Sequence, residues 1–154
     1  MKLKKILIIL LTSAVLGAFY FIFTGNEEET DYNVVINGIT IPVEIAADPA
    51  SRSTGLMFRD SLPENEGMLF IFPETKTVNF WMKNTYFPLD IAFINEQMTI
   101  IKLDSMEPHD ETRHSSDHPV KYVLETNIGF FSRSAIHVGD TVLLPDRVLG
   151  IEPK

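Results

Sequence analysis

The residues best suited to chemistry lie in one segment, residues 80–85 (FWMKNT), and in two later apolar stretches that each hold one carboxylate. In a β-strand, successive side chains alternate between faces, so Trp81 and Lys83 would share one face. An aromatic ring beside amide, hydroxyl and carboxylate groups is what a polar ring ligand or a peptide requires. We therefore predict a ligand-binding cluster. Its members are Arg59, Trp81, Asn84, Thr85, Asp90 and Glu125.

The same residues also have a purely structural interpretation. Trp81 would fill a core, and residues 84–85 would shape a turn. The two carboxylates would pair with Arg52 or Arg59 inside the fold, because a charge among apolar neighbours must be paired or exposed in a cleft. The sequence leaves both interpretations open.

The two carboxylates also allow an enzymatic alternative. Asp90 and Glu125 could act as the acid and the base, or nucleophile, of an envelope polysaccharide hydrolase. This chemistry requires a defined separation between the two groups, which the sequence does not give.

A third alternative is a metal-handling protein. His109, His114 and His118 stand among carboxylates in the polar stretch 104–120, and imidazole with carboxylate suits Zn²⁺ or another divalent ion. A solvated surface loop explains the same composition.

Composition and missing motifs exclude several classes of function. The chain has 13 basic and 21 acidic residues, a formal charge of −8, which disfavours binding to a phosphate backbone. It has no cysteine, and therefore no disulfide or thiolate site. No nucleophile elbow, His-Glu-x-x-His pair or phosphate-binding glycine loop is present, so we expect no cofactor and favour a non-enzymatic function.

The N-terminus predicts a membrane anchor. Residues 1–5 hold three lysines, and residues 6–23 carry no charge; as a helix that run is about 27 Å long, close to the hydrocarbon thickness of a bilayer. The flanking charges place the N-terminus in the cytoplasm and the rest outside. We predict an anchor over 1–24, an acidic linker over 25–32 and a domain over 33–154. A signal peptide cleaved after Gly17, which would release the domain, is the alternative.

The sequence predicts that the elements which position these residues are mainly β-strands. Asn37-Gly38 separates two β-type runs, 33–36 and 39–45, and predicts a hairpin. Asp48-Pro49 begins a short helix over 49–54 that ends at Gly55. Further short apolar runs with turn residues between them predict a β-sandwich or small barrel with one or two short helices. These runs are 68–72, 78–82, 90–94, 98–103, 122–125 and 141–144.

Five blocks of sequence carry a resemblance to a family. They are 52–59 (RSTGLMFR), 67–72 (GMLFIF), 80–85 (FWMKNT), 88–93 (PLDIAF) and 122–129 (YVLETNIG). Their order and spacing resemble domain of unknown function 192, also called uncharacterised protein family 0127, over roughly residues 34–145. The resemblance implies a jelly-roll-like β-sandwich preceded by a signal or anchor segment, and it implies no activity.

We therefore expect a non-enzymatic binding or accessory module of the cell envelope. The N-terminal helix would hold it at the membrane, with the domain facing outward. Its ligand would be a glycan, a peptide or another envelope protein, and no nucleic acid.

Overall fold

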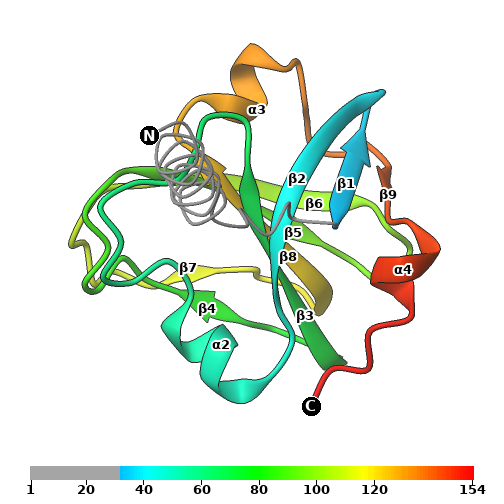
Figure 1. Cartoon of the computed structure of the whole chain (residues 1–154), viewed down its shortest axis with the longest axis horizontal. Helices are drawn as coiled ribbons and strands as arrows, with labels where there is room; N and C mark the ends of the chain where they lie inside the picture. The colour runs from blue at the N-terminus through cyan, green and yellow to red at the C-terminus, as the bar shows by residue number, and fades with distance from the viewer. Residues whose placement is uncertain (1–31) are drawn as a thin grey trace, which may run out of the picture.

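The computed structural model describes residues 32–154, which form a β-rich domain (Figure 1). The predicted anchor over 1–24 and residues 25–31 of the predicted linker lie outside the described residues. Within residues 32–154, no helix is long and apolar enough to cross a membrane.

The described residues are mainly β, as predicted, with three short helices. The strands are β1 Asn33–Ile36, β2 Ile39–Ala46, β3 Gly67–Lys76, β4 Asn79–Phe80, β5 Leu89–Ile94, β6 Ile100–Met106, β7 His114–Ser115, β8 Val120–Asn127 and β9 Val142–Leu143. The helices are α2 Pro49–Thr54, α3 Phe130–Arg133 and α4 Asp146–Leu149.

The strands form one curled seven-stranded sheet in the order β6-β5-β8-β3-β2-β1-β9, beside a two-stranded sheet of β4 and β7 (Figure 1). The pairs are antiparallel except β2 with β3. The two edges of the large sheet meet at one end, where the Gly139 N–H donates to the Ile100 carbonyl at 2.8 Å. The fold is therefore a half-barrel. The expected pair of sheets facing each other in a jelly-roll-like sandwich is wrong.

The local expectations from turn and cap residues are confirmed. Asn37 and Gly38 have φ of 52° and 79°, and join β1 to β2 by a two-residue turn. The Asp48 carboxylate caps α2 by accepting from the backbone of Ala50 at 2.9 Å and of Ser51 at 3.1 Å. Gly55, with a φ of 49°, ends the helix.

Two apolar cores cover the two faces of the curled sheet. Alternate residues of β3 separate between them, with Leu69 and Ile71 in one core and Met68 and Phe70 in the other. The first core joins side chains from both ends of the sheet and so fills the inside of the curl. The second lies on the outer face, beneath α2 and β4. Both faces of β3 are therefore buried, which explains its continuous apolar run.

Two sequence expectations on the outer face need correction. The strand expected over 78–82 is reduced to β4, residues 79–80. The long loop expected over 104–120 is partly regular: β6 continues to Met106, and β7 lies within the segment and pairs with β4.

Candidate functional site

A cavity of about 460 Å³ opens on the outer face of the sheet. Its walls are α2 with the residues that follow it, 52–57, and the segment 76–81 that contains β4. Figure 1 shows α2 next to β4, and residues of both line this cavity. The volume lies within the range of small-molecule sites, about 300–1,000 Å³. The fold therefore provides room for a ligand between a helix and an arm of the chain.

Glu125 in β8 lines this cavity and is 4% exposed. Its cross-strand neighbours are Met68 on β3 and Ile91 on β5, both buried and apolar. Among the described residues, nothing donates a hydrogen bond to its carboxyl group or pairs with it. Burial raises the pKa of the Glu125 carboxyl from 4.5 to about 8. The carboxyl is therefore mostly protonated at neutral pH and free to bond with a ligand.

Aromatic side chains form much of the cavity wall. The Phe80 ring meets those of Phe70 and Phe93 edge-on, with centroids 5.0 Å and 6.1 Å apart. Trp81, the next residue, is 45% exposed and lines the cavity, with the Lys83 ammonium 5.3 Å from its ring. Trp81 follows the end of β4, which is Asn79–Phe80. The structural interpretation expected Trp81 to fill a core. The exposure of its side chain shows that it does not.

The charged side chains around the cavity are mostly basic. Arg52 is occupied, because its guanidinium donates to the carbonyls of Ala47 at 2.6 Å and Ile71 at 3.0 Å. The exposed Lys76 ammonium stands 5.2 Å from the Phe72 ring. Arg113 is exposed and has no ion pair within residues 32–154. Three bases and one acid thus line the cavity of a chain in which acids outnumber bases 21 to 13.

The structure brings three of the six predicted site residues to this cavity: Trp81, Thr85 and Glu125. Thr85 is buried, at 4% exposure, and its hydroxyl lies 3.4 Å from the Lys83 carbonyl.

The other three predicted residues do not line the cavity. Arg59 pairs with Glu44, with Nη2 and Oε2 2.8 Å apart, and not with either predicted carboxylate. Asn84 has a φ of 53° and serves a turn. Asp90 accepts from the Ser105 hydroxyl at 2.8 Å.

The predicted acid–base pair is not assembled. In the register between β5 and β8, Asp90 faces Thr126 and Ile91 faces Glu125. Directly opposed residues share a face and consecutive residues do not, so Asp90 and Glu125 point to opposite sides of the sheet. The two carboxyl groups therefore cannot flank one glycosidic bond as the hydrolase alternative requires.

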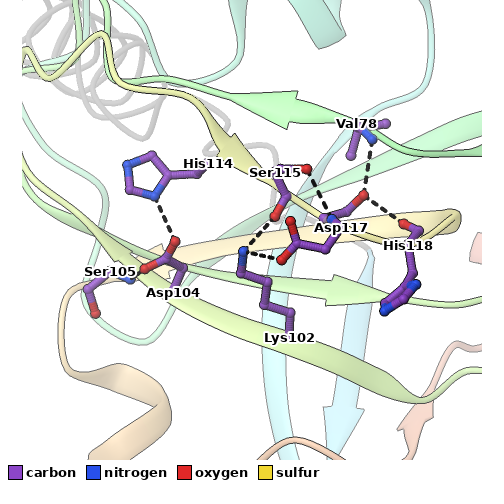
Figure 2. A network of polar contacts seen from close by, with 9 residues as sticks. Val78, Lys102, Asp104, Ser105, His114, Ser115, Asp117 and His118 are labelled. Carbon is purple, nitrogen blue, oxygen red and sulfur yellow. Dashed lines mark hydrogen bonds and ion pairs between the residues drawn. The ribbon is translucent and has the colours of Figure 1, made fainter.

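The three candidate metal-binding histidines are also apart. His114 Nδ1 lies 2.8 Å from Asp104 Oδ2, whereas the His118 carbonyl accepts a hydrogen bond from the Ser116 hydroxyl at 2.7 Å (Figure 2). The His109 ring lies 5.4 Å from that of Tyr86. In the part of the chain that the structure describes, no three His, Asp or Glu side chains are placed to hold a metal ion. The metal alternative thus has no ligand set here.

The polar network in Figure 2 instead fixes the segment before β8 onto the sheet. Lys102 on β6 donates to the Ser115 carbonyl at 2.8 Å and to Asp117 at 2.7 Å. The buried Ser116 hydroxyl accepts from the Val78 N–H at 3.1 Å. These bonds hold β7 against β4 and so position Arg113, the residue before β7, at the cavity.

Sequence reasoning missed Phe72, Lys76 and Arg113. Phe72 continues the alternation of Met68 and Phe70 on β3, a signal that the sequence carries. Lys76 follows an irregularity in the pairing of β3 with β8, so that alternation does not predict its place at the cavity. Arg113 comes from an irregular segment, and only the pairing of β7 with β4 brings it to the cavity.

Comparison with known proteins confirms the sequence resemblance. The model of DUF192, described as "Uncharacterized ACR", matches residues 32–144. A candidate transcription regulator from Sinorhizobium meliloti 1021 is 41% identical, with a TM-score of 0.70, over 73% of this chain and 92% of that one. A protein of unknown function from Novosphingobium aromaticivorans DSM 12444 is 34% identical, with a TM-score of 0.68, over 72% of this chain and 83% of that one. No curated protein matches the chain.

Proposed function

We propose, from the premise that this chain belongs to the uncharacterised DUF192 family, that it is a binding module whose outer-face cavity holds a small ligand. The observation that carries this proposal is Glu125, a buried and unpartnered carboxyl group that lines a cavity of ligand size. A buried polar group without a hydrogen bond costs free energy, and a ligand that bonds with it removes that cost. A purely structural carboxyl group would carry its partner within the fold.

The cavity supports binding better than acid–base catalysis. Within residues 32–154, Glu125 is the only acidic side chain that lines it, and the second predicted carboxylate, Asp90, lies on the opposite face. Aromatic side chains around one hydrogen-bonding group are typical of a recognition site.

We test this proposal by blocking the cavity. Ser53 is exposed on α2 and lines the cavity, whereas Ser132 is exposed on α3 and does not. Thermal unfolding of the full chain in mild detergent is measured against aromatic acids, aromatic amines, dipeptides and glycan fragments. We expect at least one class to raise the midpoint of the wild type and of Ser132→Tyr, but not that of Ser53→Tyr.

Two results would contradict binding in this cavity. Either no class of compound raises the wild-type midpoint, or the compounds that do so act equally on Ser53→Tyr. The matched Ser132→Tyr variant controls for the effect of adding a tyrosine to a short helix.

We also propose that the module acts in the cell envelope, held at the membrane by its N-terminal segment. The lysines of residues 1–5 and the uncharged run 6–23 support this location. Protease treatment of intact cells should digest the domain of the full chain while cytoplasmic proteins survive. Recovery of the intact chain with the soluble cytoplasmic fraction would contradict the location without affecting the cavity proposal.

A further inference from the structure

We infer that the cavity takes an organic anion with an aromatic or similarly apolar body. The anionic group binds Lys76 and Arg113, the body lies along Trp81, and Glu125 donates a hydrogen bond to an uncharged oxygen of the ligand. This inference rests on the proposed function and names the class of ligand.

The sign of the charge around the cavity selects an anion. Lys76 and Arg113 are exposed cations without ion pairs among residues 32–154, so a ligand carboxylate would meet donors that no protein carboxylate occupies. Arg52, although held by backbone carbonyls, adds a third positive charge. In a chain whose net charge is −8, this local excess of positive charge favours an anion over a cation of the same size.

The walls of the cavity select an apolar body. Phe70, Phe72, Phe80 and Trp81 line it together, and only Trp81 among them is strongly exposed. A flat apolar group laid against these rings would be removed from water on the side that contacts them. An inorganic anion would gain nothing from them.

Glu125 contributes a neutral hydrogen-bond donor. Since burial raises its pKa to about 8, its carboxyl group keeps a proton at neutral pH and can donate it to a carbonyl or hydroxyl oxygen. The charged groups facing it across the cavity are Arg52 from α2, Lys76 from β3 and Arg113 from the segment before β7.

On the sheet itself, the charged residues in the same cross-strand row as Glu125 are already paired. Asp104 on β6 lies two strands away and contacts His114, and Glu44 on β2 lies two strands away on the other side and pairs with Arg59. Both groups are acidic, so this row of the described sheet supplies no cation that could pair with Glu125.

The test compares four compounds that share a phenylpropyl body. The first is 3-phenylpropionate, which is negatively charged, and the second is its neutral amide. The third is 3-phenylpropylamine, which is positively charged, and the fourth is phenylalanine, which is a zwitterion. Trp81 is the only tryptophan of the chain and lines the cavity, so its fluorescence reports binding in the full-length protein. For compounds of about 11 heavy atoms we expect dissociation constants of roughly millimolar size.

We expect the anion to bind tightest, with the amine weakest. Arg113→Gln should weaken anion binding about 3- to 10-fold, whereas Arg133→Gln on α3, which removes the same charge away from the cavity, should leave it unchanged. As Glu125 loses its proton between pH 7 and 9, wild-type affinity for the neutral amide should fall because its uncharged oxygen loses a donor. Affinity for the anion should fall because it meets a new negative charge. Glu125→Gln should lose this fall, because its amide still donates but does not titrate.

Each other result has a defined meaning. Tighter binding of the amine or of phenylalanine, or equal binding of all four, would overturn the anion class and leave the cavity proposal standing. An equal effect of Arg113→Gln and Arg133→Gln would remove Arg113 from the site. If none of the four binds at about 10 mM, the inference that the ligand is an aromatic anion is overturned. The thermal-unfolding test with the wider set of compounds and Ser53→Tyr then decides separately whether the cavity binds any ligand.

Discussion

Replacing Glu125 by glutamine should change how the stability of the fold depends on pH. The wild-type carboxyl is protonated in the folded state up to about pH 8, but ionises near pH 4.5 once unfolding exposes it. Between these values unfolding releases a proton, so the free energy of unfolding falls as pH rises. The stabilisation is fully present below pH 4.5 and is lost as pH rises through 8. Glutamine keeps the shape and carries no proton to lose.

The magnitude follows from the two pKa values. Each pKa unit corresponds to about 1.36 kcal/mol, so the slope is about 1.4 kcal/mol per pH unit, becoming shallower near pH 8. From pH 6 to pH 8 the wild type should lose about 2 kcal/mol relative to Glu125→Gln. For a domain of this size that is a relative change of roughly 5–10 °C in the unfolding midpoint.

The assay is urea unfolding of the full chain at pH 6, 7 and 8, followed by far-UV circular dichroism. Glu74→Gln is the matched control, since Glu74 is an exposed glutamate in β3 whose replacement should leave the pH dependence unchanged. The comparison needs only the change in the difference between variants, which cancels the titration of all other groups.

A difference between wild type and Glu125→Gln that stays constant from pH 6 to pH 8 would refute the reasoning. It would mean that the carboxyl group ionises in the folded state as it does in water, so that the cavity is open to solvent around it. The argument for a neutral donor in the ligand site would then fail with it.

Three further changes test the frame around the cavity. Ser116→Ala should cost about 1–2 kcal/mol in urea unfolding, because it leaves the buried Val78 N–H without its acceptor; retained stability would show that water replaces the hydroxyl. Gly67→Ala should cost about 1–3 kcal/mol in the same assay, since its Cβ would lie 2.6 Å from the Glu125 carbonyl oxygen; an unchanged midpoint would mean that β3 and β8 shift apart freely. Phe80→Ala should cost about 2–4 kcal/mol and raise the quenching of Trp81 by acrylamide, because the ring fastens β4 to Phe70 and Phe93; unchanged quenching would place the anchor of this arm elsewhere.

Sequence reasoning succeeded where the cause of the structure is local. The Asn37-Gly38 turn, the Asp48 cap and the Gly55 helix end each depend on residues within a few positions of one another, and all three are confirmed. The family resemblance is confirmed as well, because it too is carried by local blocks.

The expectations that were wrong depend on pairing between distant segments. The parallel pairing of β2 with β3 makes one curled sheet where a sandwich was expected. No local sequence pattern predicts this pairing. Arg59 meets Glu44, a partner supplied by β2, the neighbour of β3. For Asp90 and Glu125, a shift of register by one residue would have placed both on one face, and the sequence does not set that register.

The cavity lies on the outer face of the sheet, whereas the inside of the curl holds the first apolar core. The inner core joins side chains from both edges of the sheet, together with Phe130 and Phe131 of α3. On the outer face, Gly55 allows the end of α2 to lie close to Phe70, since an added Cβ would approach the ring to 3.2 Å, and Arg52 of α2 bonds with the Ile71 carbonyl of β3 at 3.0 Å. The arm with β4 is held by Phe80 and by the network around Ser116. α2 and the segment with β4 thus contact the sheet at separate points. The cavity lies between them, and the unpartnered Glu125 lines it. Ligand specificity should therefore change with α2 and residues 76–81 while the curled sheet stays the same.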